Sequence, residues 1–169
     1  WRPKQDYRKN YSAIKKMGGG IILDDIHEFD LLFWLLNFPA VKAMNIYYDK
    51  VSNLDINVED MYLASFKFKN KILASVKGDY LQRYYTRNCK IVGQEGNLNW
   101  DANKNEVWLE LTGRKKRLFQ YKNYNHNIAF LRQAEYFLAC IWQNKKCLND
   151  INEAEKTLKI ILTLKKQRN

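Results

Sequence analysis

The sequence has 169 residues, with 29 Lys and Arg against 18 Asp and Glu, which gives a formal net charge of +11. Apolar residues are plentiful, and only seven glycines and two prolines interrupt them, so the composition excludes a disordered chain and predicts one folded domain. The longest apolar run, residues 31–38, is too short to cross a bilayer. Three widely spaced cysteines, Cys89, Cys140 and Cys147, match neither a disulfide framework nor a zinc site, and they favour a reducing, cytoplasmic setting.

Residues 1–16 are polar and irregular, and they are predicted to form a lead-in to the domain, with a short helical turn near residues 12–17. The first residue is Trp1 rather than Met, so we expect a piece of a longer protein. Arg8 and Tyr11 in this lead-in either lie on the surface or line a cleft. The residues alone leave both interpretations open.

A helix is predicted from about residue 20 to residue 37, directly after Gly18-Gly19-Gly20 and before Pro39. Its apolar residues recur at helical spacing and also fill most of the remaining circumference, which is typical of a buried helix.

Asp24, His27 and Asp30 interrupt this apolar helix at intervals of three residues, which makes their side chains neighbours. The carboxylate of Asp24 could bond one ring nitrogen of His27, so that the imidazole could take a proton from a substrate hydroxyl. The alternative is a partly buried histidine that merely satisfies nearby carboxylates. Asp30 could instead bond the sheet or the lead-in, and Asp25 and Glu28 are expected to face solvent.

A series of β-prone segments separated by short turns follows, which predicts an antiparallel sheet; the segments are residues 40–48, 61–68, 72–80, 89–92, 98–100, 107–111 and 118–121. Two helices are predicted after them, with apolar stripes formed by Ile128, Leu131, Ala134, Leu138 and Ile141, and by Ile151, Ala154, Leu158, Ile161 and Leu162. Asp150 with Glu153 is typical of the start of the second helix. The fold class is therefore α+β, with a largely antiparallel open sheet and helices on one face. The other face, with alternating Phe, Tyr and aliphatic residues, would be available for dimerisation.

Arg83, next to Tyr84 and Tyr85, follows a predicted strand end, a position that often lines a site but can also be an ordinary charged edge. The net charge, with Tyr80, Tyr84 and Tyr85, also raises the alternative of a non-catalytic basic sheet that binds nucleic acid or another protein. The acidic residues around His27 weigh against nucleic acid.

The motif Gly18-Gly19-Gly20-x-x-x-Asp24-x-x-His27-Glu28-x-Asp30 resembles the start of the C-terminal domain in the Gfo/Idh/MocA oxidoreductases. Further similar motifs follow in the same order over nearly the full length; they are Trp1-Arg2-Pro3, Asp6-Tyr7-Arg8, Tyr11-Ser12, Val58-Glu59-Asp60, Asp79-Tyr80-Leu81-Gln82-Arg83, Ile91-Val92-Gly93-x-x-Gly96, Trp100-Asp101, Phe137-Leu138 and Leu148-Asn149-Asp150.

This resemblance implies a two-domain enzyme that acts on a sugar, polyol or related hydroxy compound. Residues 1–169 would be its C-terminal substrate-binding and oligomerisation domain, and an N-terminal Rossmann domain outside this sequence would bind NAD or NADP. His27 would be the proton-transfer residue and Asp24 its partner or a substrate ligand. Arg8, Tyr11 and Arg83 are further candidates for substrate contact. The Glu-Lys-Pro motif common in the Rossmann half of the family does not occur here.

Overall fold

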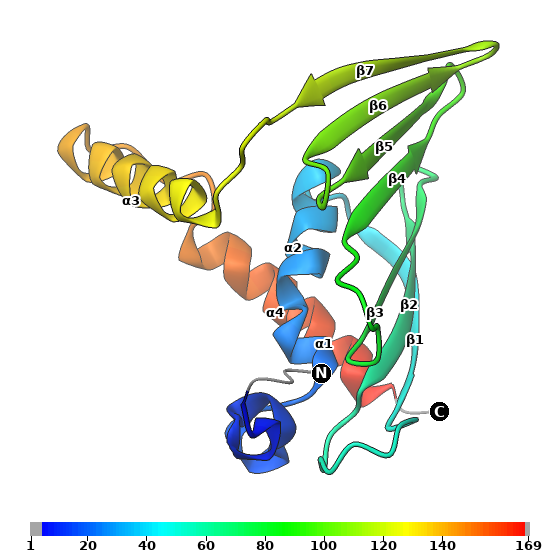
Figure 1. Cartoon of the computed structure of the whole chain (residues 1–169), viewed down its shortest axis with the longest axis vertical. Coiled ribbons are helices and arrows are strands. Elements are labelled where there is room, and N and C mark those ends of the chain that lie inside the picture. Colours follow the sequence, from blue (N-terminus) through cyan, green and yellow to red (C-terminus); the bar gives the residue numbers. More distant parts are fainter. Residues whose placement is uncertain (1–4, 168–169) are drawn as a thin grey trace. The chain divides into compact units, whose positions relative to one another are not determined.

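The computed structural model describes residues 5–167, so the Trp1-Arg2-Pro3 motif lies outside the described residues. The chain forms two compact units, residues 1–82 with 149–169 and residues 83–148. The first unit begins with the short 3-10 turns η1 (Tyr7–Lys9), η2 (Tyr11–Ala13) and η3 (Lys15–Met17). Its other elements are α1 (Ile21–Asp24), α2 (Ile26–Leu35), β1 (Val41–Asp49), β2 (Met61–Phe68), β3 (Leu73–Asp79) and α4 (Ile151–Lys166) (Figure 1).

The predicted helix over residues 20–37 is present but broken into α1 and α2 at Asp25. The Asp25 N–H still donates to the Ile21 carbonyl at 2.9 Å, and the Asp25 carbonyl accepts from the Glu28 N–H at 2.8 Å. The expected stop before Pro39 is confirmed, because Asn37 and Phe38 take positive φ values of 58° and 48°.

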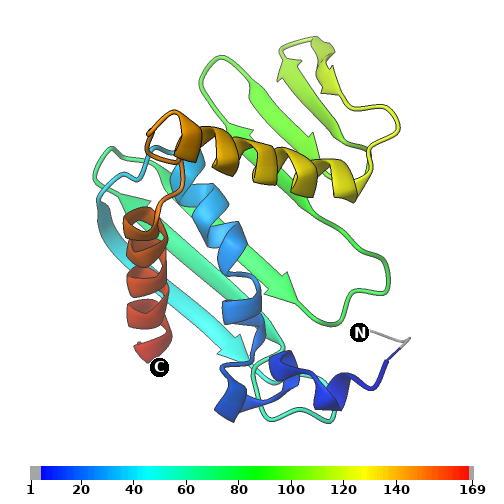
Figure 2. The same cartoon turned by 90° about the vertical axis from the view of Figure 1, so that its left-hand side faces the viewer.

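The first sheet has the order β1-β2-β3, and both pairings are antiparallel, as predicted. Strand β2 alternates strictly between buried and exposed residues. Its buried side, Tyr62, Ala64, Phe66 and Phe68, forms the core with Phe29 and Phe33 of α2. Figure 2 shows α2 and α4 side by side across this face. The phenylalanines thus face the helices, so the expectation that they lie on the open face is wrong.

Helix α4 begins as predicted, because Asp150 Oδ1 accepts from the backbone N–H groups of Asn152 and Glu153, both at 3.0 Å. Its buried residues are Thr157, Ile161 and Leu164, so only part of the predicted apolar stripe is correct. Ile151, predicted on that stripe, is 83% exposed. The Thr157 hydroxyl donates to Asp30 Oδ1 at 2.8 Å, so the side of the helix that carries Thr157 faces α2.

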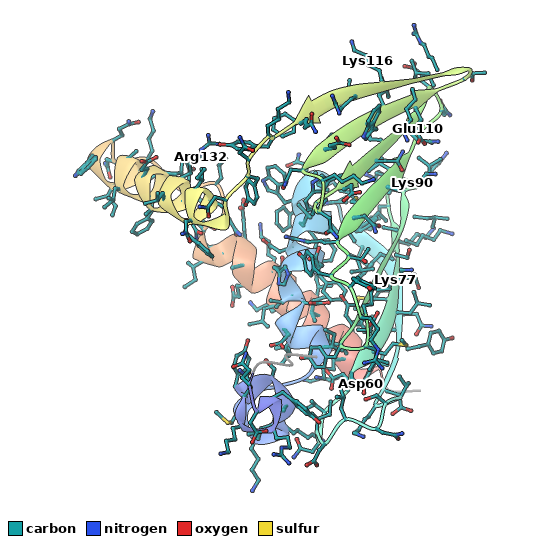
Figure 3. All side chains as sticks on the ribbon, in the orientation of Figure 1. Asp60, Lys77, Lys90, Glu110, Lys116 and Arg132 are labelled. Carbon is teal, nitrogen blue, oxygen red and sulfur yellow. The ribbon has the colours of Figure 1, made fainter. Side chains whose placement is uncertain are left out.

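The second unit is an antiparallel sheet in the order β4 (Asn88–Val92), β5 (Asn97–Asp101), β6 (Glu106–Leu111) and β7 (Arg114–Gln120), followed by α3 (His126–Trp142). Strand β7 includes the basic run from Arg114 that precedes its predicted start. Lys90 and Lys116 project from β4 and β7 (Figure 3). The predicted apolar stripe of α3 is largely exposed, with Leu131 at 62% and Ile141 at 57%, so only α4 covers a sheet face as expected. None of the three cysteines forms a disulfide within the described residues.

Taken together, the two antiparallel sheets and their helices confirm the predicted α+β class. Within residues 5–167, no helix combines the length and apolar character needed to cross a membrane.

Candidate functional site

The candidate site lies at the α1–α2 break in the first unit. The glycines before α1 allow the tight backbone turn that leads into this helix pair. Gly20 has a φ of 114°, and a Cβ there would lie against the carboxylate of Glu59. The Gly20 N–H donates to the Ser12 carbonyl at 3.0 Å, and the Ile21 N–H donates to the Glu59 carbonyl at 3.1 Å. Close contact with the lead-in and with the start of β2 therefore requires glycine at this turn.

The same hydrogen bonds decide whether this glycine segment could hold a dinucleotide. A phosphate cradle needs backbone N–H groups directed at the ligand from the start of a helix. Here the N–H groups of Gly19, Gly20 and Ile21 are already bonded to backbone carbonyls, and α1 has only four residues. The segment does not fit a nicotinamide dinucleotide.

The Asp24 carboxylate accepts a hydrogen bond from Tyr80, the residue that directly follows β3. The Tyr80 hydroxyl donates to Asp24 Oδ2 at 2.6 Å, and Tyr80 is only 6% exposed. Burial, followed by the hydrogen bond to Asp24, raises the pKa of Tyr80 well above its usual range, so the phenol remains a donor. The second carboxylate oxygen, Asp24 Oδ1, is buried and has no hydrogen-bond partner among the described residues.

Asp25, predicted to face solvent, is instead largely buried against the sheet. The Tyr62 hydroxyl lies 3.4 Å from Asp25 Oδ2, and Gly78 is the register partner of Tyr62 on β3. A Cβ on Gly78 would overlap both the Asp25 carboxylate and the Tyr62 ring. Burial raises the pKa of the Asp25 carboxyl to about 6, an effect that His27 opposes and Glu28 reinforces.

This raised pKa predicts a specific pH dependence of stability. An aspartate in the unfolded chain titrates near a pKa of about 3.9, so the folded state binds the Asp25 proton more tightly. The stabilisation it contributes is complete below about pH 4 and is lost as the pH rises through about 6. We expect Asp25→Asn, which mimics the protonated acid, to melt at a higher temperature than the wild type at neutral pH and at the same temperature near pH 4. A melting difference that stays constant over this range would contradict the assignment.

His27 lies on the first turn of α2, and 57% of its side chain is exposed. Its Nε2 atom is 3.1 Å from Glu28 Oε1, and the Glu28 side chain is 23% exposed rather than solvent-facing as predicted. The carboxylate of Glu28 thus lies at the ring, and one oxygen of Asp24 is bonded by Tyr80. The pairing of Asp24 with His27 stays a prediction. An exposed imidazole beside a carboxylate can exchange a proton with a ligand.

The remaining residues predicted to contact a substrate are Arg8, Tyr11 and Arg83. Arg8 in η1 is 2.7 Å from Asp6 Oδ1 and 3.9 Å from Asp55 Oδ2, and Tyr11 in η2 is half exposed. Both belong to the lead-in of the first unit, whereas Arg83 is exposed and belongs to the second unit. Their contact with a substrate stays a prediction.

Several neighbouring polar residues have structural roles. Asp30, at one end of the predicted triplet, accepts from Asn149 Nδ2 at 2.9 Å and from Thr157, and so joins α2 to α4. The buried Asp60, labelled in Figure 3, accepts from the Val51 N–H at 2.8 Å and from Ser52, which closes the loop before β2. Within the part of the chain that the structure describes, no group of three or more His, Cys, Asp or Glu side chains could hold a metal ion.

Tyr62, Tyr80 and Glu28 are not among the site residues predicted from the sequence. The Asp79-Tyr80 pair at the predicted strand end was the available signal for Tyr80, because residues at strand ends often reach into a site.

Solved structures with the same fold include several oxidoreductases. UDP-N-acetylglucosamine 3-dehydrogenase GnnA from Acidithiobacillus ferrooxidans is 21% identical, with a TM-score of 0.72 over 85% of this chain and 45% of that one. Aldose-aldose oxidoreductase from Caulobacter crescentus, complexed with glycerol, is 20% identical, with a TM-score of 0.75 over 98% and 49%. Biliverdin reductase from Synechocystis sp. PCC 6803, in complex with biliverdin and NADP+, is 12% identical, with a TM-score of 0.74 over 94% and 49%.

This chain therefore spans about half the length of these solved structures. Comparison with curated proteins gives no match. Residues 1–161 match the family model for the C-terminal alpha/beta domain of the Gfo/Idh/MocA oxidoreductases, and this match extends over both compact units. The match confirms the predicted resemblance to this family, and the chain belongs to the Gfo/Idh/MocA oxidoreductase family through its C-terminal α/β domain.

Proposed function

We propose that this chain is the substrate-binding and proton-transfer half of an NAD(P)-dependent oxidoreductase that acts on a sugar, polyol or related hydroxy compound. The observation that carries the proposal is the His27 imidazole, exposed at the α1–α2 break and 3.1 Å from the Glu28 carboxylate. Family membership and the sugar-active relatives with this fold support the reaction class.

The proton is the part of the reaction that this chain would handle. When an alcohol is oxidised at carbon, its hydroxyl proton must go to a base, and histidine is the side chain most often used. The ring of His27 would take that proton, and the negative charge of Glu28 would stabilise the imidazolium that forms. Asp24, fixed by Tyr80 at the same break, would orient the substrate or the ring.

The nicotinamide cofactor would be held elsewhere in a longer protein. The glycine segment before α1 does not fit a dinucleotide, as its N–H groups are already bonded. The described residues cover about half the length of the related structures, so we assign the cofactor to an N-terminal Rossmann domain. Residues of that domain would determine whether NAD or NADP is bound.

The outer face of the β1–β3 sheet is the proposed oligomer interface. It presents the exposed side chains of Tyr47, Leu63 and Leu73, with Ser65 and Ser75 between them. No helix among the described residues of the first unit covers these side chains, and an exposed apolar patch rimmed by polar residues is typical of an association surface. We propose that a second copy of the protein binds there.

The test of the function is an assay of the full-length protein with NAD or NADP and a panel of UDP-N-acetylglucosamine, D-glucose and myo-inositol. We expect formation of the reduced nicotinamide, followed by its absorbance, with at least one member of the panel. The absence of reduction for every pair, with a protein that binds the cofactor, would contradict the proposal for this substrate class.

A further inference from the structure

We propose that Tyr80 is a positioning residue, which fixes the carboxylate of Asp24 in the single orientation that the site at the α1–α2 break uses. The inference rests on the proposed function, because Asp24 is one of its site residues. The hydrogen bond from the Tyr80 hydroxyl to Asp24 Oδ2, at 2.6 Å, joins the end of β3 to the end of α1 over 56 residues of sequence. A charge-assisted bond of this length is among the stronger ones in proteins.

Tyr80 can position another side chain because its own backbone is held on both sides. Its N–H donates to the Asp60 carbonyl at 2.9 Å. Directly after it, the N–H groups of Leu81 and Gln82 donate to Asp79 Oδ1 at 2.8 and 2.9 Å, which forms a tight turn at the end of β3. Asp60 is in turn fully buried and bonded to the loop before β2. The phenol therefore extends from a rigid support toward α1.

The bond also has a fixed direction. The phenol of Tyr80 remains protonated, so the hydroxyl always donates and Asp24 Oδ2 always accepts. This occupies one carboxylate oxygen and leaves Oδ1 as a buried acceptor without a hydrogen-bond partner among the described residues. A buried acceptor in this state is costly and calls for an explanation in a native site. We infer that Oδ1 is reserved for a donor that is present when the site works.

The neighbouring Tyr62–Asp25 pair lies at the same break but does not have the short hydrogen bond that joins Tyr80 to Asp24. Its oxygens are 3.4 Å apart, at the outer limit for a hydrogen bond. The Asp25 carboxyl is largely buried, with its pKa raised toward neutrality, which suits a structural acid. Tyr80 and Asp24 thus form the pair whose geometry is tightly defined.

The test is a double-mutant cycle in the full-length protein, with Tyr80→Phe, Asp24→Asn and the double variant assayed for nicotinamide reduction. We expect Tyr80→Phe to lower kcat about tenfold with KM changed less than about twofold, because a hydrogen bond to a charged group is lost. In the Asp24→Asn background the same substitution should change kcat less than about twofold, because the two residues act as one unit. Equal effects of Tyr80→Phe in both backgrounds would overturn the proposal.

Tyr48→Phe is the matched control. Tyr48 faces the same core and donates its hydroxyl to the Lys165 carbonyl at 3.0 Å, so this variant also loses one phenol hydroxyl but does not touch Asp24. We expect its kcat to equal that of the wild type. Should Tyr80→Phe not fold, Asp24→Asn alone decides: it should lower kcat about tenfold, and an unchanged kcat would overturn the role of the pair.

A second readout does not depend on turnover. Crystal structures of the wild type and of Tyr80→Phe should show the Asp24 carboxylate rotated away from its original direction in the variant. A carboxylate in the same place would overturn the positioning role, whatever the kinetics. Failure of the wild type to reduce any nicotinamide would instead count against the proposed function, so the two failures are distinguishable.

Discussion

Replacing His27 with alanine in the full-length protein is expected to lower kcat for nicotinamide reduction by about 10²–10⁴-fold, the usual contribution of a general base. The imidazole is the proposed acceptor of the substrate proton, and no other residue at the α1–α2 break is a histidine. Because 57% of the side chain is exposed, the free energy of unfolding should change by no more than about 0.5 kcal/mol. Steady-state kinetics combined with urea unfolding measures both quantities.

Two comparisons make this result specific. Added free imidazole should restore part of the rate of His27→Ala, because a small base can occupy the space that the side chain leaves. Glu28→Gln retains the ring and removes the negative charge beside Nε2, so we expect a smaller loss than that of His27→Ala. A His27→Ala protein with a rate within about twofold of the wild type would show that the base lies elsewhere.

The largest expected effect on stability is that of Phe33→Ala, which should cost about 3–5 kcal/mol of unfolding free energy. Phe33 is 1% exposed, and its ring packs edge-on against those of Phe66 and Phe68 of β2, with centroid distances of 5.5 and 6.2 Å. The ring of Phe38 stacks on it at 6.3 Å. Deleting the ring removes these contacts and leaves a cavity under the sheet. Urea unfolding followed by circular dichroism measures the loss.

Trp34→Ala is the control for this prediction, because the next residue on α2 is 53% exposed. A solvent-exposed truncation of this kind usually changes stability by about 0.5 kcal/mol or less. Similar losses for Phe33→Ala and Trp34→Ala would mean that α2 does not pack on the sheet through the Phe33 face.

The sheet could be predicted from the sequence because its signal is local. The two-residue alternation of Met61–Phe68 defines a strand with one buried face, and the short turn after it defines the antiparallel partner. Which face of the sheet, helix-covered or open, carries the phenylalanines could not be predicted in the same way. Alternation identifies two faces, but only the packing of Phe29 and Phe33 shows which face the helices cover.

The break at Asp25 gave no signal in the apolar periodicity, since Ile22, Ile26 and Phe29 continue through it. What separates α1 from α2 is a set of tertiary contacts, including the approach of Asp25 to Tyr62 over the space that Gly78 leaves. The same reason applies to Asp24 and Tyr80, which are 56 residues apart. Spacing along one helix suggested His27 as a partner of Asp24, but it could not show that Tyr80, at the end of a strand, bonds the same carboxylate.

The register of α4 was also decided by a long-range polar contact. An apolar stripe predicts which side of a helix is buried, and Ile161 was assigned correctly. Thr157 was not predicted in the core, because a hydroxyl is buried only when it has a partner. That partner is Asp30 on α2, which the sequence had placed among the polar residues of the possible site.

The measurement that tests the proton-transfer role of His27 most directly is a crystal structure of the full-length protein with its nicotinamide cofactor and a hydroxy substrate bound. We predict that a ring nitrogen of His27 lies within hydrogen-bond reach, about 2.6–3.2 Å, of the hydroxyl on the carbon to be oxidised. A bound substrate whose reacting hydroxyl meets a different base, with His27 directed into solvent, would contradict the role assigned to this residue.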